Sequence, residues 1–350
     1  MRYPFQLQLR DKDFVPPRCP REECPAHQLG TPFPWTYRGT FYRKVDGLDV
    51  QRFQCLTCRR SFSTQTFRTD YRLRRPETVL PNFVAANSKT TLRKMGRNYE
   101  LSRSHVARRQ RLLATHARRF HEHRLQLARA RGGLGSRFQF DELETYEQHR
   151  KLKPLTGCVA IEVETGFIVH TDVETLPARK PLKKGEAAVL KRIEAVEGVR
   201  RSGSRQAVQR TVEALGRFAR AGEVKVTTDK KSSYCTALER EFGDRLKHTR
   251  IDGRRERGNR NPLFPINHTL ARLRDLVSRL VRQTWAAAKK RERLADHIAI
   301  TTGFRNYVDG WRSEPAERQR VSAAQVLGLA TRRYTPQEYL YWMDPLCLAA

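Results

Sequence analysis

Two stretches far apart in the chain each have the pattern of a short strand that ends in an aspartate. In the first, residues alternate with a period of two, so Phe138 and Phe140 share one face and Asp141 lies on the other. The second stretch, 223–234, repeats this alternation before Asp229. Aspartates at the ends of neighbouring strands can share a divalent metal ion, the arrangement that phosphodiester chemistry uses. The alternative is an ordinary turn after each strand, where aspartate is common.

The net charge restricts the partners that this chain can have. Its 350 residues include 69 Lys and Arg against 37 Asp and Glu, a formal net charge of +32. An excess of this size calls for a polyanionic partner, and we expect nucleic acid rather than a membrane surface. No apolar run approaches the roughly 18 residues of a spanning helix, and the first residues lack the apolar centre of a signal peptide. We therefore expect a cytoplasmic, nucleoid-associated protein of two or three domains.

Four of the seven cysteines form two closely spaced pairs near the start of the chain: Cys19, Cys24, Cys55 and Cys58. A reducing compartment disfavours disulfides, and tetrahedral zinc takes four thiolates when short spacing puts two sulfurs on each side of the ion. The pattern predicts a zinc ribbon that holds one structural Zn²⁺. Two alternatives remain open, namely that His27 replaces one cysteine or that the four thiols carry no metal, although so short a segment has little core without it.

From Ser88 the chain has a helical pattern with strongly basic faces. Apolar residues at helical spacing predict two helices packed across a turn at 99–102, which resembles a helix-turn-helix, with Ser102 as the N-cap of the second helix. That helix starts with the residues that a recognition helix presents to base edges and phosphates: Arg103, Ser104, His105, Arg108 and Arg109. The alternative is a solvated basic face with no role in DNA binding. A basic helix is expected to continue to Arg131, where glycines mark a linker.

The rest of the chain alternates strands and helices. Three consecutive antiparallel strands follow the linker, and a Lys- and Arg-rich insertion near 176–205 is expected to lie on the surface. An amphipathic helix over 207–219 leads into the strand of Asp229. A helix, a short strand and a long helix after Pro265 complete the order, and the long helix is expected to carry an apolar stripe on one face and arginines on the other.

This order is that of an α/β, RNase H-like fold, a mixed sheet with flanking helices. Joined to the zinc ribbon and the helix-turn-helix, it resembles insertion-sequence transposases of the DDE class over roughly residues 19–309. The resemblance rests on FQCLTCRRSF, SRSHVARR, FQFDELE, VTTD and PLFPINHTLARLRDLVSRLVRQTW. It implies that Asp141 and Asp229 are the first two catalytic ligands of Mg²⁺ or Mn²⁺. It also implies that the partner is double-stranded DNA, at element ends and target, and that the chain acts as a homo-oligomer on DNA.

The third acid of this family is missing from its usual place. The family has an acid, usually Glu, early on the last helix beside an Asn-His pair, and here Asn267 and His268 have no acid beside them. Asp275, seven residues after His268 and so on nearly the same helical face, is the candidate for the third catalytic residue. Its helical neighbours Arg272 and Arg279 are typical of a solvated face instead. A neutral ligand from Asn267 or His268, or a metal held by two aspartates and water, stays open.

The sequence therefore predicts four segments: a zinc ribbon (1–72), a helix-turn-helix region (73–131), an RNase H-like catalytic domain (137–309) and a C-terminal tail (310–350). The first functional hypothesis is a transposase that cleaves element ends and transfers the freed strand to target DNA. The alternative is a catalytically inactive, domesticated transposase that only binds DNA. An RNase H-like nuclease shares the metal chemistry but does not require two DNA-binding modules.

Overall fold

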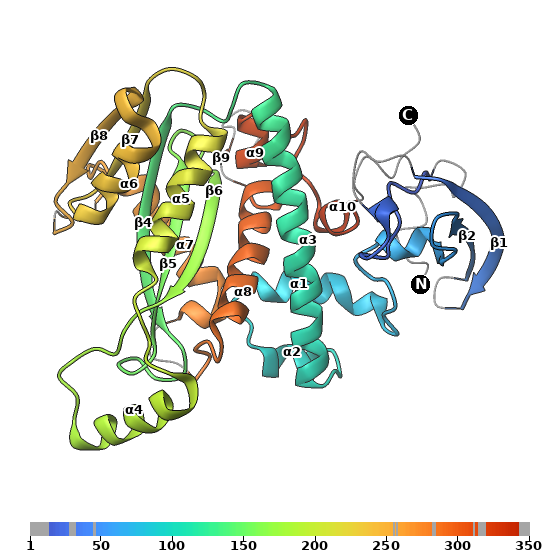
Figure 1. Cartoon of the computed structure of the whole chain (residues 1–350), viewed down its shortest axis with the longest axis horizontal. Coiled ribbons are helices and arrows are strands. Elements are labelled where there is room, and N and C mark those ends of the chain that lie inside the picture. The colour runs from blue at the N-terminus through green and yellow to red at the C-terminus, as the bar shows by residue number, and fades with distance from the viewer. Residues whose placement is uncertain are drawn as a thin grey trace. The chain divides into compact units, whose positions relative to one another are not determined.

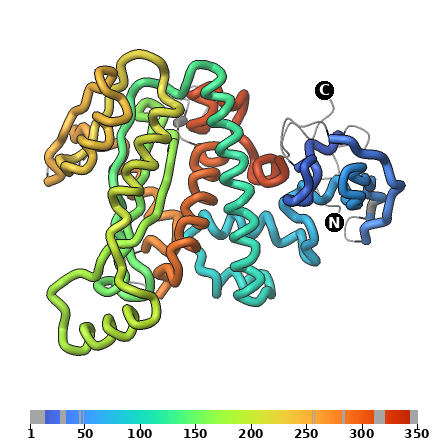
Figure 2. The backbone as a smooth tube through the Cα atoms, viewed as in Figure 1, coloured from blue at the N-terminus to red at the C-terminus, as the bar shows by residue number. Residues whose placement is uncertain are grey.

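The computed structural model of this chain divides into two compact units, Met1–Pro81 with Gln337–Ala350, and Asn82–Pro336 (Figure 1, Figure 2). The structure describes residues 14–27, 33–44, 47–254, 256, 258–281, 285–310, 312–313 and 320–342. Parts of the predicted tail, 314–319 and 343–350, lie outside these residues.

The first unit is built around a small antiparallel sheet. Its strands pair in the order β1 (Trp35–Arg43), β2 (Leu48–Cys55) and β3 (Ser61–Ser63). Short 3₁₀ helices accompany them: η3 (Pro25–His27), η4 (Thr64–Phe67) and η5 (Pro76–Thr78). The buried cluster consists of the rings of Phe14, Phe53 and Phe62, Ala26 and three cysteines. Part of the tail belongs to this unit, because the Thr69 hydroxyl donates to the Leu340 carbonyl at 2.7 Å.

The next helices are α1 (Val79–Ala86), α2 (Leu92–Asn98) and α3 (Arg103–Ala130). Ser102 caps α3 as predicted, since its hydroxyl accepts from the backbone N–H of His105 at 3.2 Å. The turn between α2 and α3 is tight, and a Cβ added at Gly96 would lie 2.7 Å from the carbonyl oxygen of Leu101. Glycine is therefore required where α2 meets the turn.

α3 is one continuous helix of 28 residues, so the predicted continuation of the basic helix is confirmed. It lies beside α8 (Arg291–Gly303), and the Arg118 guanidinium donates to the Asp296 carboxylate at 2.9 Å (Figure 1). Within the part of the chain that the structure describes, no helix combines the length and the apolar character needed to cross a bilayer.

The second unit contains a five-stranded mixed sheet in the order β6-β5-β4-β7-β8. The strands are β4 (Arg137–Tyr146), β5 (Pro154–Glu162), β6 (Ile168–Thr175), β7 (Val224–Asp229) and β8 (Leu246–Ile251). β4, β5 and β6 are antiparallel, whereas β7 pairs in parallel with both β4 and β8. The prediction of three consecutive antiparallel strands is confirmed.

Helices cover both faces of this sheet. One face carries α5 (Ser204–Phe218) and α6 (Ser232–Phe242), and the other carries α7 (Phe264–Leu276) and α8 (Figure 1). On the α6 side, the rings of Phe140 and Tyr234 pack edge to face with centroids 4.7 Å apart. On the α7 side, Leu143 and Val159 of the sheet pack in one buried cluster with Leu270. The two faces of β4 are thus committed to different helices.

The predicted insertion forms α4 (Lys184–Glu197), which has no buried residue, and this confirms a surface excursion. Short elements complete the unit: η6 (Gly243–Arg245), η7 (Ser278–Leu280), η8 (Phe304–Val308), β9 (Arg312–Ser313), β10 (Arg320–Val321) and α9 (Ala323–Val326). The last helix, α10 (Pro336–Leu340), begins at the end of this unit.

The long helix expected after Pro265 is shorter than its apolar stripe suggests. α7 ends at Leu276, and Arg279 belongs to the turn η7. The prediction that Arg279 lies on a solvated face is wrong, because its side chain is buried and donates to Gln110 at 3.0 Å and to His297 at 2.8 Å. Polar partners from α3 and α8 make this burial possible.

Two histidines, His297 fully buried and His121 partly buried, join these helices to their surroundings. His121 on α3 accepts from the Tyr307 hydroxyl at Nδ1 (2.9 Å) and donates from Nε2 to the Val169 carbonyl (3.1 Å). His297 on α8 donates from Nε2 to the Ala86 carbonyl (2.7 Å). Because carbonyl oxygens only accept, Nε2 carries the proton in both rings.

We expect the free energy of unfolding to fall steeply in mild acid. Burial lowers the pKa of His121 from 6.5 to about 4 and that of His297 to about 3. Both rings protonate near pH 6.5 in an unfolded chain, so their contribution is complete above that pH and is lost as the pH falls toward the folded pKa values. Uptake of one proton by each ring on unfolding lowers the free energy of unfolding by about 2.7 kcal/mol for each pH unit. Urea unfolding across this range tests the slope, which His297→Gln should roughly halve; an unchanged slope would contradict the assignment.

Candidate functional site

The register of two central strands brings Asp141 and Asp229 side by side. β4 and β7 pair in parallel, and their last paired residues are Gln139 and Thr227. Carried two residues further, the same register sets Asp141 opposite Asp229. Paired residues of neighbouring strands point to the same face, so both carboxylates leave the same side of the sheet. The prediction that the two Asp-bearing strands are neighbours is confirmed.

Backbone N–H groups hold one oxygen of each aspartate. Asp141 Oδ1 accepts from the N–H of Glu142 at 2.7 Å, and Asp229 Oδ1 accepts from the N–H of Lys231 at 3.0 Å. Both aspartates are half-buried. Two carboxylates on one face, each with a fixed orientation, are a donor set suited to Mg²⁺ or Mn²⁺, which prefer oxygen ligands.

The start of α7 lies on the face of the sheet that carries the two aspartates. Gln139, on the same face as Asp141, accepts from the backbone N–H of Ile266 at 3.1 Å and donates to the Pro262 carbonyl at 2.7 Å. Asn267 follows Ile266 directly in the first turn of α7. The start of α7, which carries Asn267, therefore packs on the face of β4 from which Asp141 projects.

Asp275 lies at the other end of α7. It is nine residues after Ile266, which corresponds to about 14 Å along the axis and to roughly half a turn around it. Ile266 is buried toward the sheet, whereas the Asp275 side chain is 68% exposed and lies 3.6 Å from the Lys89 ammonium. The structure brings Asp141 and Asp229 together and leaves Asp275 on the outer side of its helix.

His268 lies in the first turn of α7, and its ring stacks on that of Phe264 with centroids 5.8 Å apart. Burial lowers its pKa, and the nearby charges of Arg305 and Arg272 lower it further. The ring is thus held in the neutral form, in which an imidazole nitrogen can accept a proton or ligate a metal.

Glu142, for which the sequence predicted no role, is a carboxylate next to Asp141 with an enclosed side chain. It lies on the opposite face from Asp141, and its side chain is 7% exposed and paired with Lys231. Burial acts to raise the pKa of Glu142, but hydrogen bonds from Lys231 and Ser204 hold the pKa below its ordinary value. Strand alternation, which puts Glu142 on the face of Phe138 and Phe140, was the available signal.

The four cysteines of the first unit form one compact cluster. Cys19 and Cys58 have their sulfurs 3.6 Å apart, Cys24 and Cys55 have theirs 3.9 Å apart, and all four lie within 4.8 Å of one another. A tetrahedral site with Zn–S bonds of 2.3 Å has edges of about 3.8 Å, so the cluster fits zinc. His27 is outside it and instead bonds through Nδ1 to the Cys19 carbonyl at 2.8 Å.

The first turns of α3 expose most of the residues predicted to bind DNA. Arg103, Ser104, His105 and Arg108 are exposed. Arg109 is different, because it is 6% exposed and lies on the same side of α3 as the buried Val106. A side chain so enclosed is not available to a DNA surface in this conformation.

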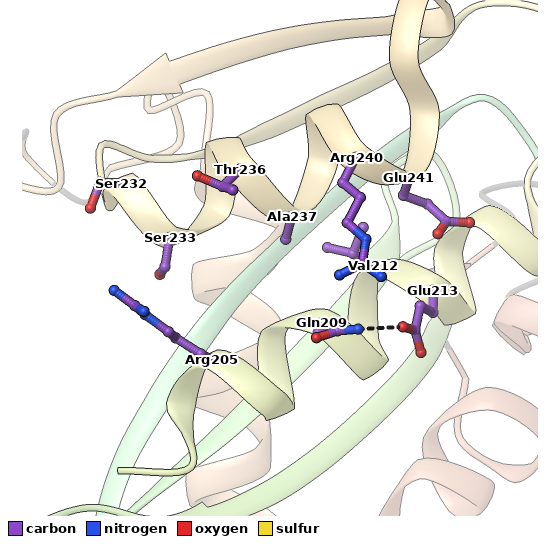
Figure 3. Close-up of a pocket in the computed structure, with 10 residues that line it drawn as sticks. All are labelled: Arg205, Gln209, Val212, Glu213, Ser232, Ser233, Thr236, Ala237, Arg240 and Glu241. Atoms are coloured by element: carbon purple, nitrogen blue, oxygen red, sulfur yellow. Dashed lines mark hydrogen bonds between the residues drawn. The ribbon is translucent and has the colours of Figure 1, made fainter.

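A hollow of about 310 Å³ lies between α5 and α6 (Figure 3). Arg205 and Ser233 lie at one end and Glu213 and Glu241 at the other, with Gln209 donating to Glu213 at 2.9 Å. These helices cover the face of the sheet opposite to Asp141 and Asp229. The hollow is therefore separate from the candidate site.

No protein-family model matches the chain, and no curated protein matches it in sequence. Among solved structures, it is similar to the catalytic domain of Mos1 mariner transposase, with 14% identity over 57% of this chain and 91% of that chain and a TM-score of 0.24. It is also similar to a pre-cleavage Mos1 transpososome, with 12% identity over 64% and 75% of the two chains and a TM-score of 0.19. It is similar as well to a Mos1 transposase paired-end complex with the left transposon end, with 13% identity over 65% of this chain and 76% of that chain and a TM-score of 0.22. Likeness this weak does not assign a function.

Proposed function

We propose that this chain is a DDE-type transposase that cleaves DNA strands and transfers the freed end to a target. The observation that carries the proposal is the register that sets Asp141 opposite Asp229 on one face of a five-stranded mixed sheet. The strand order and directions are those expected of an RNase H-like fold. The net charge of +32 and the exposed basic start of α3 supply a surface for double-stranded DNA.

In this proposal Asp141 and Asp229 hold Mg²⁺ or Mn²⁺, with Asn267 or His268 as a neutral neighbour. The bound metal would polarise the phosphodiester and neutralise charge that develops during strand cleavage. The N–H groups of Glu142 and Lys231 each bind Oδ1 of one aspartate. In this proposal the second oxygen, Oδ2, is the one that would bind the metal. The chain thereby presents two oriented carboxylates on one face of the sheet, from the neighbouring central strands β4 and β7.

The proposed organisation has a zinc ribbon in 1–72, a helix-turn-helix in 73–131, a catalytic domain in 137–309 and a tail in 310–350. The cysteine cluster supports the first of these, and the capped turn between α2 and α3 supports the second. Zinc has a structural role here, because four thiolates leave no open coordination position. Action as a homo-oligomer on DNA is part of the proposal.

We expect Arg103→Ala with Arg108→Ala to weaken DNA binding and to reduce its salt dependence. Each lost phosphate contact lowers the slope of log K against log salt by about 0.9, so the pair should lower it by up to about 1.8. Binding to element ends and to random DNA at several salt concentrations measures both effects. Arg129→Ala is the control, since it removes an exposed charge from the opposite end of α3. Equal losses in the control would contradict a specific role for the start of α3.

A catalytically inactive, DNA-binding relative is the second candidate. It is favoured by the absence of a carboxylate from the first turn of α7 and by the exposure of Asp275. The purified chain should nick plasmid carrying the element ends with Mg²⁺ or Mn²⁺ and not with EDTA. Protein that binds this DNA but cleaves with neither metal would establish the alternative.

A further inference from the structure

The register sets Asp141 opposite Asp229, but no direct β4–β7 pairing reaches these two residues. The pairing of β4 with β7 ends at Gln139 and Thr227, two residues before each aspartate. A divalent ion held by both carboxylates requires a defined spacing between them. Asp141 remains paired with Val159 of β5 and Asp229 with Ile251 of β8, so a direct contact between β4 and β7 beyond Gln139 and Thr227 would help to fix that spacing.

An ion pair joins the middle of β4 to a residue just beyond the end of β7, on the opposite face of the sheet. It joins the carboxylate of Glu142, which follows Asp141, to the ammonium group of Lys231, which follows Asp229 by two residues. The same two residues donate their backbone N–H groups to Asp141 and Asp229. Each end of the ion pair thus also orients one aspartate.

The Glu142 side chain is 7% exposed and its carboxylate oxygens are well supplied with donors, whereas the Lys231 side chain is 41% exposed. Glu142 Oε1 accepts from the Thr156 hydroxyl at 2.9 Å and the Ser204 hydroxyl at 2.7 Å, while Oε2 accepts from the Tyr234 hydroxyl at 3.0 Å. The Lys231 ammonium also donates to Ser204 at 2.9 Å. These donors come from β5, α5 and α6, so the position of Glu142 is determined by three elements besides its own strand.

We infer that Glu142 and Lys231 are positioning residues: their ion pair clamps the middle of β4 to the end of β7 and so sets the affinity of Asp141 and Asp229 for divalent metal. This inference rests on the proposed function. Neither side chain touches the metal in this arrangement. Both act through the backbone on the aspartates that do.

The test is titration of the full chain with Mn²⁺ alone. The electron paramagnetic resonance signal of the free ion measures how much Mn²⁺ remains unbound. Glu142→Gln and Lys231→Met should each weaken Mn²⁺ binding about 10- to 100-fold, the usual effect of removing a group that supports a metal ligand. Glu144→Gln is the matched control. It removes a carboxylate from the same face of β4, but from a side chain that is 61% exposed and paired with Arg179.

The double variant Glu142→Gln/Lys231→Met separates positioning from stability. Lys231→Met leaves the buried Glu142 carboxylate without its partner, whereas the double variant leaves no charge there, so the thermal unfolding temperature that Lys231→Met lowers should recover in the double variant. Mn²⁺ binding should stay weak in the double variant, because the clamp is still absent. Recovery of Mn²⁺ affinity together with stability would overturn the inference. If a single variant does not fold, the double variant decides.

Asp141→Asn distinguishes failure of this inference from failure of the proposed function. Mn²⁺ binding that is unchanged by Asp141→Asn would mean that the aspartates hold no metal, and the proposed function would fail. Binding that is lost in Asp141→Asn but unchanged in Glu142→Gln and Lys231→Met would leave the metal site intact and refute only the clamp.

Discussion

Asp141→Asn and Asp229→Asn are each expected to lower the rate of DNA strand cleavage at least about 100-fold, with DNA affinity within about twofold of the wild type. Loss of one carboxylate forfeits several kcal/mol of charge stabilisation in the reaction, and about 1.4 kcal/mol is a factor of ten in rate. Affinity should survive because phosphate contacts dominate it and come from basic side chains elsewhere. Cleavage of labelled element ends with Mn²⁺, beside binding in EDTA, measures the two quantities separately.

Asp275→Asn is the informative companion to these variants. Its side chain is 68% exposed and its ion pair with Lys89 lies at the surface, where such pairs contribute little. We expect cleavage close to that of the wild type, which would leave Asn267 and His268 as candidates for the third position. Loss of cleavage in Asp275→Asn with DNA binding retained would instead make Asp275 the third acid. Wild-type cleavage rates in both Asp141→Asn and Asp229→Asn would refute the proposal that the chain is an enzyme.

Removal of zinc is expected to unfold the first unit. Its buried cluster is small, and structural zinc contributes about 10–16 kcal/mol in comparable peptides, more than most small domains have in total. Protein purified without chelator should contain one zinc per chain by elemental analysis. Cys55→Ser, or treatment with a strong chelator, should make the region before Pro81 sensitive to protease.

Cys235→Ser is the control for the zinc prediction, because Cys235 is a free cysteine on α6 in the other unit. It should change neither the zinc content nor the protease pattern. An N-terminal region that stays protected in Cys55→Ser would show that zinc is not needed for this fold.

Much of the fold was predictable from local sequence patterns, because strand alternation and helix capping involve residues only a few positions apart in the chain. Strand alternation assigned Asp141 to the face opposite Phe140, and a serine before a basic helix identified the N-cap at Ser102. The four cysteines were identifiable because thiolate pairs at short spacing have few other uses in a reducing compartment. Each of these inferences needs only a few consecutive residues.

What the sequence did not predict depends on partners from distant parts of the chain. Arg279 follows the helical pattern of a solvated arginine, and only Gln110 and His297 explain why it is buried. The role of Glu142 likewise needs Ser204 and Lys231, which no local pattern connects to β4. Helix ends such as that of α7 at Leu276 are set by the same long-range packing.

Because α3 is continuous, the side chains at its start have a fixed direction around the helix axis relative to those at its end. The helix contains neither proline nor glycine between Arg103 and Ala130, so it has no hinge and is about 42 Å long. Its first turns expose the basic residues, and its later turns bond to Asp296 on α8 and to Val169 on β6. One inserted residue in the middle would rotate one end against the other by about 100°, and four would restore the facing to within about 40° while adding about 6 Å. In the proposed transposase, the number of residues in α3 would therefore set the direction in which DNA bound at its start faces the sheet.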